Sequence, residues 1–157
     1  MPGTLNLSTM SLPIKLVGFI TEHDKYIPGA AVFKDVLNST PVNAFTDRQR
    51  ADNKKLMTYL EQGCFLTGWM GYVADLQTRE LIGPDAYFTD GVWIWPSYFP
   101  HYLKKFLYME INEAFLDHLR AKNFVFSLEP GFEENKLAFE KEFDAILTGG
   151  RSNTFSL

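Results

Sequence analysis

The stretch AYFTDGVWIW, residues 86–95, decides the fold. Two short runs of aromatic and β-branched residues flank Asp90-Gly91, a dipeptide typical of a tight β-hairpin turn. The preceding run, residues 64–75, is apolar, aromatic and interrupted by glycines, so we interpret it as a central strand that another backbone approaches closely. The sequence therefore predicts a small antiparallel β-meander over about 64–95.

Helical patterns lie on both sides of this meander. The clearest covers residues 47–62, where the apolar side chains of the second half gather on one helical face before Gly63. Beyond the meander, Ser97 and Asn112 are candidate N-caps of two further helices, and residues 132–147 have the spacing of a final amphipathic helix. We expect an α+β fold in which several α-helices pack on one face of the small antiparallel sheet.

The length and composition of the chain favour one compact core. Its 157 residues suit a single core, and its 46% apolar residues lie well above the fraction typical of a disordered chain. We therefore predict a single globular domain over residues 1–157, with apolar runs at 14–20 and 124–126 as candidates for additional short strands. The two ends, about 1–12 and 149–157, are rich in small and polar residues, and we expect them to be flexible.

The negative charge of the chain is concentrated in two segments. The formal net charge is −4, with four acidic residues against one basic in 62–96 and six against three in 124–157. Nucleic-acid binders need clustered Lys and Arg, whereas adjacent basic residues occur here only in two pairs, at 54–55 and 104–105. We therefore expect no nucleic-acid partner, and the acidic segments suit a basic partner protein instead.

Cysteine use and hydropathy indicate a cellular compartment. The single Cys64 cannot form a disulfide within the chain, which fits a reduced cytosol. No window approaches about 18 consecutive apolar residues, and the first residues lack a charged segment followed by an apolar run. We expect a cytoplasmic protein that makes no membrane contact.

Three histidines are the first candidates for acid–base chemistry. We interpret His23, His101 and His118 as solvated or capping residues, because no two of them have the spacing of metal ligands. An alternative stays open, in which a small cytosolic enzyme uses His101 or His118 with a carboxylate such as Asp90 or Asp85 in an aromatic pocket.

Other catalytic and cofactor-binding patterns are missing from the sequence. It contains no nucleophile elbow, no Walker-type phosphate loop and no Cys-x-x-Cys or His-Glu-x-x-His motif. The acidic residues of 133–144 lack the alternating oxygen ligands of a calcium loop. We therefore expect no catalytic residue, no metal site and no cofactor.

Aromatic side chains are concentrated between Tyr87 and Tyr102. Core packing explains such a cluster first, but Trp and Tyr are also frequent binding anchors when they are exposed. In that second case nearby aspartates supply a polar rim, and the acidic C-terminal helix attracts a basic partner. The candidate partner-binding residues are then Asp75, Asp85, Asp90, Trp93, Trp95, Tyr98, Glu133, Glu134 and Glu140.

The segment TDGVWIWP, residues 89–96, resembles a T-D-G-x-W-x-W-P element of small bacterial proteins encoded beside polymorphic toxins. A following helix with Tyr98 and the pair His101-Tyr102 extends the resemblance, which covers about residues 55–120. Those proteins are similar to immunity proteins of interbacterial competition, such as those paired with type VI secretion effectors. The resemblance implies a non-catalytic immunity protein that binds a cognate bacterial toxin and blocks its active site.

A third function also stays open. The chain could be a dimeric structural or regulatory subunit that uses the aromatic meander as its self-interface.

Overall fold

The computed structural model describes residues 14–39, 47–106 and 109–150. The predicted flexible ends lie almost wholly outside these ranges. Within the described residues the elements follow one another in the order β1 (Lys15–Leu16), α2 (Phe33–Leu37), α3 (Asp47–Glu61), β2 (Cys64–Ala74), β3 (Leu81–Thr89), β4 (Trp93–Pro96), α4 (Tyr98–Lys105), α5 (Glu113–Ala121) and α6 (Phe132–Leu147).

The four strands form one sheet with the order β1-β4-β3-β2. β2 pairs antiparallel with β3, and β3 pairs antiparallel with β4, which confirms the predicted meander and the α+β class. β1 adds a parallel pairing, with Lys15 opposite Trp93, so the sheet is mixed. The position of β2 corrects our interpretation of 64–75 as a central strand, because β2 forms an edge of the sheet.

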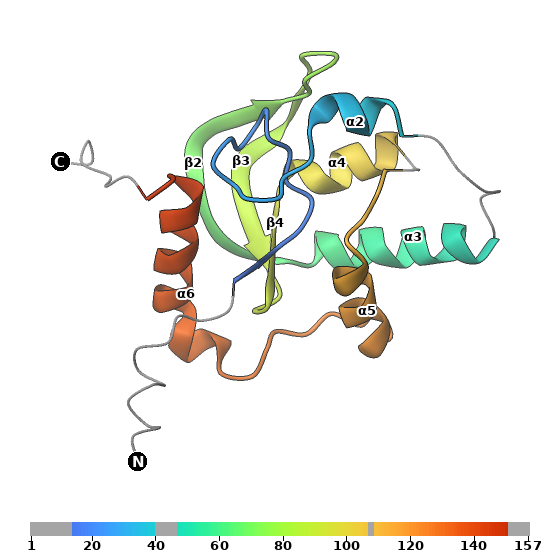
Figure 1. Cartoon of the computed structure of the whole chain (residues 1–157). Coiled ribbons are helices and arrows are strands. Elements are labelled where there is room, and N and C mark those ends of the chain that lie inside the picture. Colours follow the sequence, from blue (N-terminus) through green and yellow to red (C-terminus); the bar gives the residue numbers. More distant parts are fainter. Residues whose placement is uncertain (1–13, 40–46, 107–108, 151–157) are drawn as a thin grey trace.

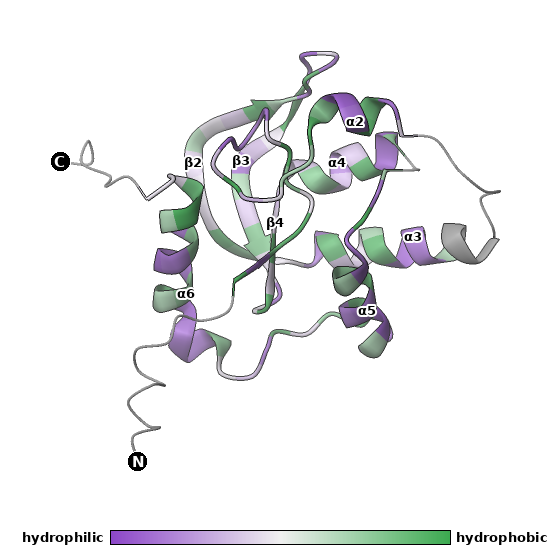
Figure 2. Ribbon diagram, viewed as in Figure 1, coloured by the Kyte–Doolittle hydropathy of each residue, from purple (hydrophilic) through white to green (hydrophobic). Residues whose placement is uncertain are grey.

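Helices cover both faces of this sheet and not one face as predicted, because the α6 side chains form a second apolar core opposite the first (Figure 1). Alternation along β4 directs Trp93 and Trp95 into one core and Ile94 into the other. The first core is shared with apolar side chains of α2, α3, α4 and α5, and the second with those of α6 and the loop that follows β1. Figure 2 shows the resulting alternation of hydrophilic and hydrophobic bands along α6.

Local side-chain contacts account for several element boundaries. The Asn112 side chain accepts hydrogen bonds from the N–H groups of Ala114 and Phe115, which confirms the predicted cap of α5. Ser97 makes no such capping bond, and its hydroxyl donates to the carbonyl oxygen of Pro84 instead. The predicted strand at 124–126 does not form.

The turn between β3 and β4 is one residue longer than the predicted two-residue hairpin turn. It comprises Asp90, Gly91 and Val92, and Gly91 adopts a positive φ of 98°. An added Cβ at Gly91 would lie 2.7 Å from the Glu129 side chain, so both the backbone conformation and the close approach require glycine there. None of the described helices is long and apolar enough to span a bilayer.

Candidate functional site

Asp90 lies in the turn between β3 and β4 and is fully buried. Its Oδ1 accepts hydrogen bonds from the N–H groups of Val92 (2.9 Å) and Trp93 (2.8 Å). Its Oδ2 accepts from the Tyr59 hydroxyl on α3 and from Nε2 of His118 on α5 (2.9 Å). Burial opposes ionisation, but these donors hold the pKa of Asp90 below its usual range. The carboxylate therefore ties α3 and α5 to the turn.

Asp75 performs a similar task directly after β2. Its side chain is buried, and Oδ1 accepts from the N–H groups of Gln77 (2.7 Å) and Thr78 (2.9 Å) in the turn before β3. Oδ2 accepts from Nε2 of His101 (2.6 Å) and Nζ of Lys105 (2.8 Å), both on α4. Burial again opposes ionisation, yet His101, Lys105 and the backbone donors hold the pKa of Asp75 well below its usual range.

Asp24 joins the loop after β1 to the sheet and to α4. The hydroxyls of Tyr87 and Tyr98 each donate a hydrogen bond of 2.6 Å to its carboxylate. Tyr98 also accepts from the N–H of Ile20 at 3.0 Å. Burial raises the pKa of Asp24, although both tyrosine hydroxyls oppose this shift.

The third histidine belongs to this network of buried polar groups as well. Nε2 of His23 lies 2.9 Å from the hydroxyl of Tyr102, which itself accepts the N–H of Leu76. Burial lowers the pKa of His23 to about 4, so the ring is neutral at pH 7. Our interpretation of the three histidines as solvated or capping residues is therefore wrong, since each ring binds a side chain from another element.

These clusters suit a structural role better than acid–base chemistry. The oxygens of Asp75 and Asp90 each accept two hydrogen bonds, and the imidazoles use Nε2 to make them. A cavity of about 120 Å³ lies between residues 16–19, 27–31 and 109–112, but none of the three histidines lines it. No group of three or more His, Cys, Asp or Glu among residues 14–39, 47–106 and 109–150 could hold a metal ion.

The structure separates the predicted partner-binding residues into two sets. Asp75, Asp90, Trp93, Trp95 and Tyr98 have exposed fractions between 0% and 4%, so direct contact with a partner through these side chains does not fit the structure. The aromatic segment is core, as the first of the two readings expected. The same burial excludes Trp93 and Trp95 from the surface of a dimer through the meander.

The remaining predicted residues lie at the surface. Glu133 and Glu134 are exposed in the first turn of α6, and Glu140 is half-buried further along it. Asp85 is half-buried on β3. Four of the nine predicted residues are thus exposed or half-buried, on α6 and β3, whereas the other five are buried. The nine residues therefore do not form one site.

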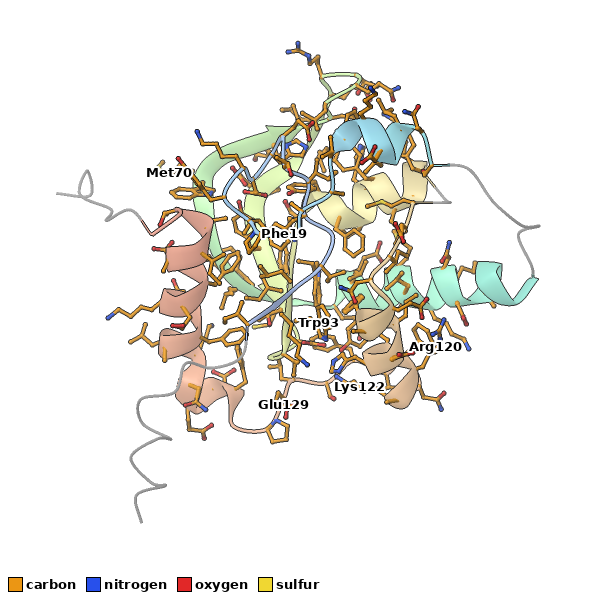
Figure 3. All side chains as sticks on the ribbon, in the orientation of Figure 1. Phe19, Met70, Trp93, Arg120, Lys122 and Glu129 are labelled. Carbon is orange, nitrogen blue, oxygen red and sulfur yellow. The ribbon has the colours of Figure 1, made fainter. Side chains whose placement is uncertain are left out.

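Exposed apolar side chains gather instead on β2. Trp69, Met70 and Tyr72 have exposed fractions of 40%, 99% and 66%, and we call these three residues the bulge patch. Phe65, earlier on the same strand, is 54% exposed. Figure 3 shows Met70 at the periphery of the molecule, whereas Phe19 and Trp93 lie toward its centre. Adjacent apolar side chains on an edge strand form a surface that other proteins can bind.

A β-bulge presents this patch. Gly68 pairs with Ala86 and Tyr72 pairs with Pro84, so three residues of β2 stand opposite Asp85 alone. Gly71 closes the bulge with a positive φ of 105°, a conformation that favours glycine. The bulge leaves Met70 almost fully exposed and Trp69 40% exposed.

The sequence did contain a signal for this bulge. Gly68 and Gly71 bracket Trp69-Met70, and glycines inside a strand mark either a bulge or a close backbone approach. The second interpretation is confirmed at Gly68, where an added Cβ would lie 2.8 Å from the carbonyl oxygen of Asp85. At Gly71 an added Cβ would meet nothing within 4 Å, so this glycine serves the backbone turn of the bulge.

Comparison of the chain with protein-family models, with curated proteins and with solved structures finds no match. The features of the chain that bear on its function are therefore the buried clusters around Asp24, Asp75 and Asp90 and the surface of β2.

Proposed function

We propose that this protein is a non-catalytic immunity protein that binds a cognate bacterial toxin and blocks its active site. The observation that carries the proposal is the bulge patch. Met70 is 99% exposed, and its neighbours Trp69 and Tyr72 add aromatic surface beside it. Aromatic residues and Met are enriched at protein interfaces, where they supply most of the binding free energy.

The resemblance of residues 89–96 to toxin-associated proteins supports the immunity part of the proposal. In this structure, Thr89, Asp90 and both tryptophans of that segment are buried, so the shared element specifies the fold. The contact surface then lies on other residues, as it must in proteins that share a fold and neutralise different toxins. The cytoplasm of the producing cell is where such a protein would meet its toxin.

The test is a pull-down with the toxin domain encoded by the neighbouring gene, followed by a toxicity assay in cells. We expect a dissociation constant in the nanomolar range or below, because inhibition must survive continuous toxin synthesis. Met70→Glu should weaken binding about 10- to 100-fold, since it places a charge in an apolar contact. Val125→Glu is the matched control, because Val125 is 64% exposed but lies outside the bulge patch.

Two outcomes would reject the proposal. One is micromolar or weaker affinity for the toxin of the neighbouring gene, or the lack of any such gene. The other is equal binding by the Met70→Glu and Val125→Glu variants. Circular dichroism on both variants ensures that a loss of binding does not come from unfolding.

The proposed interface has a second part on the acidic face of α6. Glu133, Glu134 and Glu140 would attract a basic toxin and accelerate association, as charges at the rim of an interface do. Reversal of all three to Lys should lower the association rate and reduce its dependence on salt. Unchanged kinetics in this triple variant would limit the interface to the bulge patch.

A second candidate function, a small cytosolic enzyme, is favoured by one observation. The fold pairs His118 with Asp90 and His101 with Asp75, and the rings keep side-chain exposures of 22% and 32%. If these pairs are catalytic, the purified protein will turn over nitrophenyl ester or phosphate substrates, and His101→Gln or His118→Gln will abolish turnover without loss of toxin binding. The immunity function requires neither turnover nor these imidazoles.

A further inference from the structure

The residue of β3 opposite the bulge is acidic. Asp85 faces the three-residue excursion of β2, and its backbone carbonyl closely approaches Gly68. Its side chain is only half-buried, so it is accessible beside the bulge patch. The patch therefore combines aromatic and apolar surface with one carboxylate.

A polar cluster lies directly beneath this carboxylate. The Tyr87 hydroxyl donates a hydrogen bond of 2.6 Å to Asp24, and the Trp69 side chain lies beside the same hydroxyl. The Tyr87 hydroxyl is also within hydrogen-bonding reach of Asp85. Asp85 and Trp69 therefore lie near the same buried tyrosine hydroxyl, and the register of the bulge places Trp69 opposite Asp85.

No cation of the described chain neutralises this pair of carboxylates. The ion pairs among residues 14–39, 47–106 and 109–150 include Asp75 and Asp90 but neither Asp24 nor Asp85. Burial raises the pKa of Asp85, and the negative charge of Asp24 raises it further. A positive charge supplied from outside would relieve both effects.

We infer that Asp85 and Trp69 form a receptor for one lysine or arginine side chain of the partner protein, whose charged group binds Asp85 while its alkyl stem packs on Trp69 and Met70. This inference rests on the proposed use of the bulge patch for binding. Long basic side chains fit such a surface because they combine an apolar stem with a cationic end, and Trp is the best aromatic partner for a cation. The partner's contact segment is therefore both apolar and basic.

Charge favours such a partner over a second copy of this chain. A two-fold dimer through the bulge patch would place the same patch against itself, and so Asp85 near its own copy. Two half-buried carboxylates facing each other repel, and each chain already carries a formal net charge of −4. A basic partner removes this repulsion instead of adding to it.

The test is an NMR titration of the full-length protein with the peptide acetyl-Leu-Arg-Leu-amide. We expect saturable shifts of the Trp69 indole N–H and of the Gly68 and Gly71 amides, with a dissociation constant at least tenfold lower than for acetyl-Leu-Gln-Leu-amide. Asp85→Asn should abolish this preference for arginine. Asp117→Asn, which changes an exposed aspartate on α5, should leave it intact.

Three results would overturn the inference: equal affinity for the two peptides, an unchanged preference in Asp85→Asn, or shifts that depend on protein concentration and so report a second copy. The peptide carries no toxin activity, so its arginine preference does not depend on which toxin is neutralised. Conversely, if Met70→Glu impairs toxin binding but Asp85→Asn binds both peptides and toxin like the wild type, the proposed function stands and the receptor does not.

Discussion

Asp90 illustrates how one buried side chain organises this chain. Its two oxygens bind a turn, a hydroxyl from α3 and an imidazole from α5, and the donors on the helices lie 31 and 28 residues away in sequence. The turn itself could be predicted, because Asp-Gly acts locally. The partners could not, since Tyr59 and His118 meet Asp90 only after the helices have packed.

We predict that Asp90→Asn lowers the free energy of unfolding by about 2–4 kcal/mol at pH 7, because an amide N–H₂ would face the donors Tyr59 and His118. This difference in the free energy of unfolding between wild type and Asp90→Asn should be smaller at low pH. The folded-state pKa of Asp90 is below that of the unfolded chain, so its stabilisation is present above about pH 3.8 and is lost as the pH falls through the folded-state pKa. Urea unfolding should show a smaller difference between wild type and Asp90→Asn at pH 3 than at pH 5.

The control for this variant is Asp117→Asn. Asp117 is 73% exposed and pairs only at the surface with Arg120, so the change should stay within about 0.5 kcal/mol at each pH. A difference between wild type and Asp90→Asn that grows toward pH 3 would contradict the sign of the argument.

Among the elements, β2 shows where sequence patterns stop being informative. Its length and apolar character could be predicted, and so could the close approach at Gly68. Its place at the edge of the sheet could not be predicted, because an apolar strand has the same sequence pattern whether a second strand or a partner protein covers it. α6, by contrast, begins and ends at the predicted residues 132 and 147, since its helical periodicity is a property of its own sequence.

Gly68 and Gly83 offer a matched test of the pairing of β2 with β3. Gly68→Ala should lower the free energy of unfolding by about 1–3 kcal/mol, because the new methyl group would meet the Asp85 backbone and force the strands apart. Gly83→Ala should change it by less than about 1 kcal/mol, since an added Cβ there meets nothing within 4 Å. Urea unfolding measures both, and equal effects would argue against a steric limit at Gly68.

At the scale of the whole molecule, two apolar cores share one thin sheet. The α+β class could be predicted from local turn and periodicity signals, but the distribution of helices over both faces could not. Phe143 on α6, for example, contacts Phe19 and Tyr87, and no local pattern encodes a contact between such distant residues. The side chains of Trp93, Ile94 and Trp95 belong alternately to the two cores. A substitution that destabilises one core should therefore also destabilise the other.

We therefore predict that Phe143→Leu shifts the unfolding of both cores together, by about 1–2 kcal/mol. In a Trp69→Phe background, fluorescence reports Trp93 and Trp95 of the opposite core, while circular dichroism reports the helices. Both urea midpoints should fall equally. Leu137→Ala, on the exposed side of the same helix, should leave them within about 0.5 kcal/mol, and two separate transitions in Phe143→Leu would show that the cores unfold independently.

The parallel pairing of β1 with β4 also determines the order of events during synthesis. Lys15 pairs with Trp93, so the first strand to leave the ribosome has no partner until 78 further residues have been made. At about 5–20 residues per second this delay lasts roughly 4–16 s. The segment around β1 must therefore stay unpaired with β4 while the β2–β3 hairpin is translated.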